Sequence, residues 1–544
     1  MKNLSFVKKI YSLFLFVFLI CLTFSCAKTG RPDGGPKDEN APLFVTAKPP
    51  YESTNFNKKE IKLNFDEYIV LKELNKQLVV SPPMKNPPLI TPQGTPSEFL
   101  KIEIIDTLKL NTTYIFNFGN AIQDNNEGNQ LENFKYVFST GDYIDSLTTF
   151  GSVKDAKLLE TPRSVNVLMY RIDSTFNDSI IYKRKPDYVT STLDTTNYTF
   201  TNLRKGKYLL LALKEPLNDY IFNPKTDKIG VYKNYIQLPK DSILENPLVL
   251  FKEEQPFEFA RAKETKKGKI EFGFYGDPKA MKVRLLSKTP EQFKSIAKFD
   301  TEKDTLNYWF TPLETDSLNF TVTNKEFIDT ITVRLRKKKI DSLIVSASTS
   351  NILDLRDTFF IRSNTPIVKI DTTKINLFDK DTLAVNYTIN RSKTENKIAV
   401  IFDKKPKNNY KLLMYKNALT DIFEVANDST TYAFKTIEIE DYGRITIKVE
   451  NLKSKNVIIE LLSGKNQDKL IERRFITSSS QLIFDLLKPM KYTVRAIIDE
   501  NKNNKWDTGS YLKKQMPEKI IYHEAINNYA LRANYFVEEV FNVN

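Results

Sequence analysis

The chain has 544 residues and a formal net charge of +14, with 41% apolar residues, 12% aromatic residues, one histidine and two cysteines. This apolar content is enough to build cores and excludes a mainly disordered chain, while the few cysteines and the lone histidine exclude a disulfide scaffold and histidine-rich metal sites. The basic residues are dispersed among 67 acidic ones without an aromatic-lined groove, so we expect no nucleic-acid partner.

Residues 1–25 are predicted to be a signal peptide. Three lysines precede a nearly continuous apolar run over residues 10–24. The run is shorter than the roughly 20 residues that a membrane-spanning helix needs. A basic start followed by a short apolar stretch is typical of a secretory signal. An uncleaved anchor helix is the alternative.

The pair Ser25-Cys26 directly follows this run and resembles the lipobox of bacterial lipoproteins, although Thr23 and Phe24 depart from its usual pattern. The resemblance implies cleavage before Cys26, which becomes the lipidation site. Each buried CH₂ of an acyl chain contributes about 0.8 kcal/mol, so several chains anchor a protein firmly. The partner expected at this end is therefore the membrane.

Residues 26–40 are rich in glycine and proline and predict a flexible tether. By the sorting rule of such lipoproteins, Ala27 after the cysteine implies an outer-membrane location. The periplasmic and surface faces both remain open. The chain is similar to lipoproteins of the Bacteroidetes type.

Residues 41–142 form the first of five predicted modules. Apolar residues alternate in "EIKLNFDEYI", "NTTYIFNFG" and "NFKYVFSTG", as they do in strands with one buried face. The stretches "APLFVTAKPP", "IKLNFDEYI", "AIQDNNEGN" and "YVFSTGD" resemble the bacterial Ig-like domain first described in the S-layer protein SbsA. The resemblance implies a β-sandwich without catalytic residues.

Residues 143–253 form the second predicted module. Its glycine-started strand and the stretch "FTNLRKGKYLLLALK" resemble the transthyretin-like or carboxypeptidase-regulatory sandwich. Residues 254–349 contain further strand patterns, such as "KGKIEFGFYG", and predict a third sandwich.

Two internal echoes predict that this pair of modules recurs. The segment Phe200–Ala212 aligns without a gap on Phe484–Ala496, and Asn120–Glu127 matches Asn417–Glu424. Echoes in the same order favour duplication. We therefore expect a second Ig-like domain over residues 350–440 and a second transthyretin-like sandwich over residues 441–544, in an all-β protein.

Catalytic signals are weak. His523 is the only histidine, no Gly-x-Ser-x-Gly motif is present, and "HEAIN" lacks the second histidine of a zinc protease. We interpret His523 as an ordinary strand residue. A glycosidase carboxylate pair has no fixed spacing and leaves no signature, but none of the modules looks large enough for a cleft. We expect no enzyme and no catalytic residues.

The sharpest local pattern comprises Asp499, Asn501, Asn503 and Asp507. These side chains stand at positions 1, 3, 5 and 9 of an EF-hand-like calcium loop. The match fails at position 6, where Asn504 replaces glycine, and at position 12, where Ser510 replaces the bidentate glutamate. A polar turn whose side chains bond to their own backbone is the alternative. Calcium is the one candidate cofactor.

Trp309 and Trp506 are the only tryptophans. Either would stack on a sugar if exposed, whereas burial would make it a core residue. The function that we predict is a lipid-anchored, non-catalytic scaffold, spacer or binding protein of the cell envelope, whose partner is an unidentified envelope protein or glycan. Two alternatives remain: a glycan-binding lipoprotein of a polysaccharide-uptake system, and a glycoside hydrolase.

Overall fold

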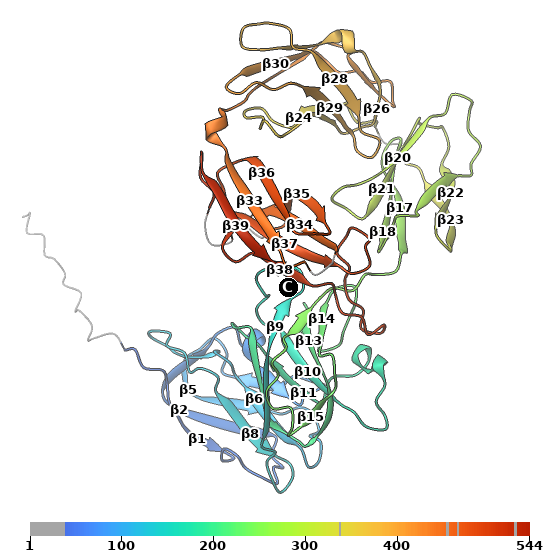
Figure 1. Cartoon of the computed structure of the whole chain (residues 1–544). Coiled ribbons are helices and arrows are strands. Elements are labelled where there is room, and N and C mark those ends of the chain that lie inside the picture. The colour runs from blue at the N-terminus through green and yellow to red at the C-terminus, as the bar shows by residue number, and fades with distance from the viewer. Residues whose placement is uncertain (1–37, 337–338, 453–455, 465–466, 527–529, 544) are drawn as a thin grey trace, which may run out of the picture. The chain divides into compact units, whose positions relative to one another are not determined.

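The computed structural model describes residues 38–336, 339–452, 456–464, 467–526 and 530–543. Short antiparallel sheets account for nearly all of its regular structure, which confirms the all-β prediction. The chain divides into two compact units: the described residues up to 144 without 81–83, and residues 81–83 with 145–544. Figure 1 traces the chain by colour.

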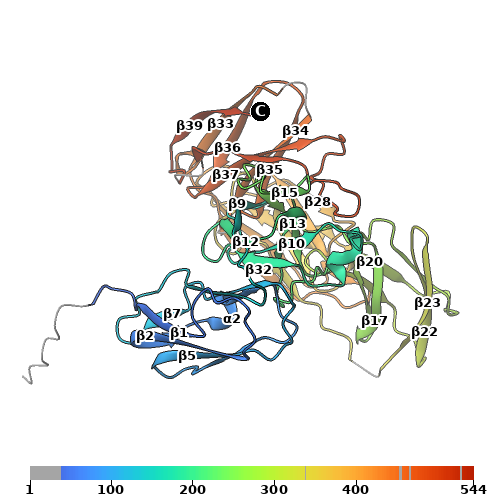
Figure 2. The same cartoon turned by 90° about the horizontal axis from the view of Figure 1, so that it is seen from below.

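The first unit holds β1–β8 and one helical turn. Its elements are β1 (Phe44–Lys48), β2 (Glu60–Leu71), α2 (Leu74–Gln77), β3 (Val79–Ser81), β4 (Leu89–Thr91), β5 (Ser97–Glu103), β6 (Thr113–Asn117), β7 (Ile122–Asp124) and β8 (Lys135–Ser139). One sheet has the order β1-β2-β5-β4, with β7 also paired to β2, and the other has the order β3-β6-β8. β1, β2 and β5 lie side by side (Figure 2). The alternation that predicts β2 is confirmed, because Ile61 and Leu63 are fully buried.

The second module follows the same two-sheet plan with a different strand order. Its elements are β9 (Leu147–Asp155), β10 (Asn166–Arg171), η1 (Asp178–Tyr182), β11 (Tyr188–Ser191), β12 (Asn197–Leu203), β13 (Gly206–Lys214), β14 (Lys228–Val231), β15 (Ile236–Leu238) and β16 (Leu248–Leu250). The sheets are β11-β10-β13-β14, with β15 also on β13, and β12-β9-β16, in which β16 runs parallel to β9.

The third module also has two sheets. Its strands are β17 (Glu258–Lys266), β18 (Lys269–Tyr275), β19 (Lys282–Leu285), β20 (Ser295–Phe299), β21 (Thr305–Phe310), β22 (Ser317–Asn324) and β23 (Phe327–Arg334). The sheet orders are β17-β18-β21-β20 and β19-β22-β23. Alternate residues of β21, namely Leu306, Tyr308 and Phe310, enter the module's hydrophobic cluster.

The fourth module begins earlier than expected. Its elements are β24 (Val345–Ala347), β25 (Phe359–Ser363), β26 (Ile367–Ile370), η2 (Thr372–Lys374), β27 (Ile375–Phe378), β28 (Tyr387–Arg391), β29 (Lys397–Phe402), β30 (Asn409–Met414), β31 (Leu419–Asp421) and β32 (Thr430–Lys435). β24 pairs with β25. Strand pairing therefore places residues 345–347 with this module, although the expected boundary between 349 and 350 assigns them to the third.

The fifth module completes the described chain. Its elements are η3 (Ile439–Asp441), β33 (Gly443–Glu450), β34 (Asn456–Ser463), β35 (Lys469–Ile476), β36 (Ser480–Leu487), β37 (Tyr492–Asp499), β38 (Ile520–Tyr522) and β39 (Phe536–Asn542). β37 is buried along its whole length. Tyr492, Val494, Ala496 and Ile498 enter the cluster between the two sheets, and Arg495 on the opposite face contacts Lys157 of the second module.

Strand pairing repeats in the order that the sequence echoes predict. The first unit's β1-β2-β5-β4 and β3-β6-β8 correspond to β24-β25-β29-β28 and β27-β30-β32 of the fourth module, and β7 on β2 corresponds to β31 on β26. The same corner bond recurs as well. The backbone N–H of Lys109 donates to the hydroxyl of Tyr114 at 2.8 Å, and that of Lys405 donates to Tyr410 at 2.8 Å.

The second and fifth modules match in the same way. β12-β9-β16 and β36-β33-β39 each join one antiparallel and one parallel neighbour to a central strand. In both, a buried tyrosine donates to the carbonyl four residues upstream. Tyr208 donates to Arg204 at 2.9 Å and Tyr492 donates to Lys488 at 3.0 Å. This is the bond of a tyrosine corner.

Within the second unit, the fifth module contacts the second directly. Glu460, 1% exposed, accepts hydrogen bonds from Arg495 at 2.8 Å and Arg473 at 2.9 Å. Arg495 also donates to the carbonyl oxygen of Lys157 at 3.0 Å. Nearby, Lys514 forms an ion pair of 2.7 Å with Asp178. Modules that are far apart in sequence are therefore joined by a hydrogen bond from the buried Arg495 and by an exposed ion pair.

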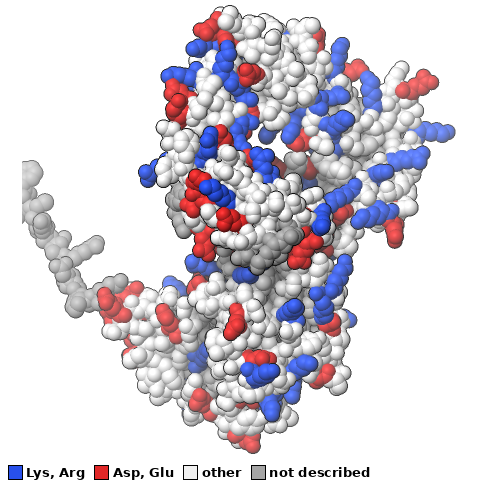
Figure 3. Space-filling model, viewed as in Figure 1, with Lys and Arg blue, Asp and Glu red and all other residues white. Residues whose placement is uncertain are grey.

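The surface carries mixed charge. On the face drawn in Figure 3, lysine and arginine side chains are intermingled with aspartate and glutamate. No helix among the described residues has both the length and the apolar character needed to cross a membrane.

Candidate functional site

The loop after β37 contains the four residues predicted to bind calcium. Asp499 ends the strand and is 3% exposed. Its two carboxylate oxygens accept backbone N–H groups from Asn503 at 3.1 Å and Asn504 at 2.9 Å. Asn504 stands where an EF-hand has glycine, and it adopts φ 63°. Asparagine tolerates this left-handed conformation, so the missing glycine does not prevent the turn.

Asp507 is the centre of the loop's side-chain bonds. Asn501 donates its amide N–H to Asp507 at 2.5 Å, Asn503 donates to the same carboxylate oxygen, and Lys505 pairs with the other oxygen at 2.8 Å. Burial acts to raise the pKa of Asp507, but the lysine and the two amides outweigh it and hold the pKa below its ordinary value. The four predicted residues thus come together as a hydrogen-bonded turn, and calcium binding stays a prediction.

Glu518 closes this loop from just before β38, and sequence reasoning missed it. Its carboxylate accepts the backbone N–H of Glu500 at 2.8 Å and that of Asp507 at 3.0 Å. Its backbone oxygen accepts the indole N–H of Trp506 at 3.0 Å. Burial raises the pKa of Glu518, helped by the nearby charges of Asp507 and Asp499. A glutamate eleven residues beyond the motif obeys no spacing rule, so the sequence holds no signal for it.

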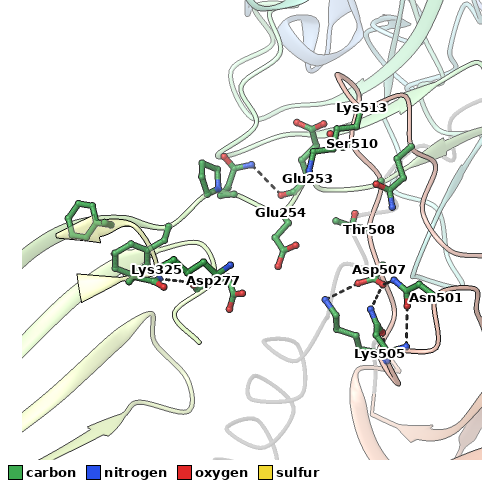
Figure 4. A pocket seen from close by; sticks show the side chains of 18 of the residues that line it. Glu253, Glu254, Asp277, Lys325, Asn501, Lys505, Asp507, Thr508, Ser510 and Lys513 are labelled. Atoms are coloured by element: carbon green, nitrogen blue, oxygen red, sulfur yellow. Dashed lines mark hydrogen bonds and ion pairs between the residues drawn. The ribbon is translucent and has the colours of Figure 1, made fainter. Parts of the chain in front are cut away.

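The loop forms one wall of an open hollow of about 880 Å³. Asn501, Lys505 and Asp507 lie together on one side, and Glu253, Glu254, Asp277 and Lys325 approach from the other segments (Figure 4). The hydroxyl of Thr508 donates to the carbonyl oxygen of Lys252 at 2.7 Å, which holds the loop to the segment after β16. Both acidic and basic groups line the hollow.

This arrangement gives the hydrolase alternative no support. Asp499 and Asp507 act as acceptors for the loop's own N–H groups and for Lys505. A glycosidase needs one carboxyl group free to protonate a leaving group and a second one across the cleft. The chemistry favoured here is structural, because these acids fix a turn.

The two tryptophans do not form an exposed platform. Trp309 is 4% exposed, and Trp506 is half-buried with the ammonium of Lys157 5.6 Å from its ring centre. His523 is also buried and packs edge-on against Phe541, and burial lowers its pKa. The histidine therefore belongs to the module's interior. The sequence analysis expected His523 to be a strand residue. It lies instead just beyond the end of β38.

The remaining site prediction, Cys26, lies outside the described residues, as do the signal peptide and most of the tether. Among the residues from 38 onward that the structure describes, no group of three or more His, Cys, Asp and Glu side chains is placed to hold a metal ion.

Residues 38–140 match the family model described as the bacterial Ig-like domain. The Ig-like prediction for the first module is confirmed at that level. Domains of this type are typically non-catalytic. No curated protein matches the chain.

Solved structures with tandem Ig-like domains also align, at low similarity. Domains 1–6 of the surface-layer protein SbsC cover 90% of this chain and 68% of their own at 12% identity, with a TM-score of 0.15. The alignment with the titin I9–I11 tandem covers 54% of this chain and 94% of the titin fragment at 11% identity, with a TM-score of 0.12. The alignment with the tandem Ig repeats of Dlar covers 33% of this chain and 98% of the Dlar fragment at 11% identity, with a TM-score of 0.14. Scores this low carry no argument about arrangement or activity.

Proposed function

We propose that this protein is a lipid-anchored spacer and binding scaffold of the bacterial outer membrane, of the Bacteroidetes type, and that it has no catalytic role. The observation that carries the proposal is the repeated pair of sandwich modules, each with its own hydrophobic cluster. Separately closed cores suit a scaffold that presents loops, because each module buries its apolar side chains against its own strands.

The anchor half of the proposal rests on Ser25-Cys26 and on the glycine- and proline-rich stretch after it. A tether of this composition lets the modules move away from the bilayer while the acyl chains stay inserted. The partner that we propose is an envelope protein or a glycan. Crosslinking in intact cells, followed by identification of what is attached, would name it.

The test of the anchor is Cys26→Ala, with Cys21→Ala as the matched control. We expect Cys26→Ala to move the protein from the membrane pellet to the soluble fraction and Cys21→Ala to leave it in the pellet. Labelling with a radioactive fatty acid should be lost with Cys26 alone. A Cys26→Ala protein that stays in the membrane pellet would contradict the lipid anchor.

We also propose that the Asp499 loop takes up calcium weakly, roughly at millimolar concentration, as sites in extracellular modules do. Side-chain rotation would have to present the amide oxygens of Asn501 and Asn503 in place of the nitrogens that now face Asp507. Trp506 is next to Asp507, so its fluorescence reports binding. Trp506 fluorescence that does not change at millimolar calcium, in the parent chain as in the Asp507→Asn reference variant, would contradict this site.

A further inference from the structure

The outer face of the first module's sheet β1-β2-β5-β4 carries its charges in rows. Strand register places Glu60 of β2 directly opposite Glu103 of β5, and Lys62 directly opposite Lys101. Lys48 of β1 lies opposite Lys62 and extends the lysine row. The intervening residues of β2 and β5 enter the hydrophobic cluster, so the charged side chains point away from it. An acidic row and a basic row therefore run side by side across the strands that Figure 2 shows next to one another.

Each row sets like charges opposite each other, which is destabilising in an antiparallel pair. The chain itself relieves this repulsion only in part. Glu60 and Lys101 form an ion pair of 2.8 Å between the rows, and the ammonium of Lys62 lies 4.2 Å from the ring centre of Phe99. In the part of the chain that the structure describes, Lys62 and Glu103 form no ion pair. These exposed charges are free to meet a second surface.

Exposed apolar side chains flank the two rows. Phe99 lies one step beyond the lysine row on β5 and is 41% exposed. Ile105 lies one step beyond the acidic row and is 57% exposed. It stays on the outer face, because the alternation of buried and exposed residues continues through the buried Ile104. The outer face along this segment thus reads apolar, basic, acidic, apolar.

This order is complementary to itself when a second copy of the sheet is turned over onto the first. A two-fold axis that lies in the interface, parallel to the rows and between them, sets each row against the opposite row of the second copy. Glu60 then faces Lys62 of the second copy, and Glu103 faces Lys101. Each contact occurs twice, as in an isologous interface. Sheets packed face to face lie about 10 Å apart, a distance that a lysine and a glutamate side chain span together.

We propose that this face of the first module binds a second copy of the chain as a two-fold dimer. The same rotation sets Phe99 of each copy against Ile105 of the other, so apolar contacts flank the ion pairs. A partner of one charge sign would meet one row of its own sign, which favours a surface that carries both signs. The inference adds a partner to the scaffold role and is independent of the lipid anchor and of the calcium loop.

The experiment measures self-association of the full chain carrying Cys26→Ala in detergent, so that neither acyl chains nor the apolar run over residues 10–24 drives it. Sedimentation velocity should show a dimer that grows with protein concentration, with a Kd of roughly 10–100 µM, because small interfaces are weak and transient. Raising the salt concentration from about 0.05 M to about 0.5 M should weaken the dimer about tenfold, since exposed charges are screened.

Charge reversal within each row tests the pairing. An all-acidic variant carries Lys62→Glu with Lys101→Glu, and an all-basic variant carries Glu60→Lys with Glu103→Lys. Each variant alone should dimerise at least about tenfold more weakly than the parent, because like charges then meet across the interface. An equimolar mixture of the two should recover the parent's affinity, because every glutamate again faces a lysine.

A matched control reverses two exposed charges elsewhere. Lys282→Glu with Arg284→Glu, on β19 of the third module, changes the net charge by as much as the all-acidic variant and should leave the dimer unchanged. A parent chain that stays monomeric at about 200 µM would overturn the proposal. Variants that dimerise as tightly as the parent would overturn this face, and a mixture that stays monomeric would overturn the two-fold pairing.

Discussion

Single buried carboxylates hold matching turns of the first and fourth modules. Asp124 ends β7 and accepts the backbone N–H groups of Glu127 at 2.6 Å, Gly128 at 3.0 Å and Asn129 at 2.8 Å. Its counterpart Asp421 ends β31 and accepts from Phe423 and Val425, both at 2.9 Å. Both aspartate side chains are buried, and each is the acceptor for the backbone N–H groups of its own turn.

Replacing either aspartate should destabilise its own module. We expect Asp124→Ala and Asp421→Ala each to lower the free energy of unfolding by about 1–3 kcal/mol, because two or three backbone N–H groups of the turn lose a charged acceptor. Denaturant melts together with hydrogen exchange at the two loops would measure the loss. Asp428→Ala, at a side chain that is 92% exposed, is the control. A loss in Asp428→Ala equal to that in Asp421→Ala would contradict the turn role.

The N–H groups around Asp124 also predict a pH dependence. Burial acts to raise the pKa of Asp124, but backbone donors outweigh it and hold the pKa below the ordinary value of about 3.9. The stabilisation is therefore present above about pH 4 and is lost as the pH falls through the lower folded pKa. Acid titration of the Asp124→Asn variant beside the parent chain should show a smaller loss of stability in the variant.

Glu215 has the opposite pH dependence. Burial, and next the hydrogen bond with Asp219, raise its pKa to about 7, even though the backbone N–H groups of Asp219 and Tyr220 donate to it. Between about pH 4.5 and 7 the folded chain binds a proton that the unfolded chain releases. Its contribution to stability therefore declines as the pH rises through this window.

Glu215→Gln removes the titrating group and tests this prediction. The slope of unfolding free energy against pH between 4.5 and 7 should become less negative in the variant, by about 1 kcal/mol over the whole window, since part of the side chain meets solvent. Urea melts at four or five pH values measure the slope. Equal slopes in parent and variant would rule out Glu215 as the source.

Among the strands, the second and fifth modules share the same tyrosine corner. Tyr208 and Tyr492 each follow a strand-to-strand turn and bond back to a carbonyl oxygen of that turn. Periodicity alone predicts both as buried strand residues. The hydroxyl bond needs the chain to reverse within four residues, which the repeated "F-x-x-L…K-Y" spacing brings about.

Tyr208→Phe and Tyr492→Phe should therefore have similar effects. Each removes one hydrogen bond and keeps the ring, so we expect a loss of about 1 kcal/mol. Tyr535→Phe, at a residue that is 53% exposed, should change little. Differential scanning calorimetry would compare the three. A strong effect at one corner and none at the other would argue against equivalent roles.

At the scale of the whole molecule, the chain's distant segments meet through Glu460. This carboxylate lies between two arginines, which together hold its pKa below the ordinary value against the effect of burial. Arg495 also donates a hydrogen bond to the carbonyl oxygen of Lys157 in the second module. Buried ion pairs add little net stability, but breaking one leaves a charge without its partner.

Glu460→Ala should cost about 3 kcal/mol, because Arg495 stays buried and unpaired. Replacing both groups, as in Glu460→Met with Arg495→Leu, should recover part of the loss. Arg444→Ala, which breaks an exposed pair with Asp485, should cost under about 1 kcal/mol. Chemical denaturation measures all three. A double variant no more stable than Glu460→Ala would contradict the charge explanation.

The strands follow from residue alternation and the tyrosine corners from the repeated spacing, because both patterns depend on local chain geometry. The sequence also brought the Asp499 loop residues together, since they are neighbours in the chain. It did not reveal Glu518, which closes that loop from eleven residues beyond Asp507, or the Arg495 contact with Lys157.

Only the tertiary structure decided the surroundings of Trp309. Trp309 lies on the side of β21 that faces away from the core of its own sandwich. The sequence analysis expected a buried tryptophan to be a core residue, yet Trp309 is buried without belonging to that core. It is buried instead where the third module meets residues 362–364 and 394–397 of the fourth. A periodic pattern tells which face a side chain takes, but which distant segment covers that face depends on how modules pack.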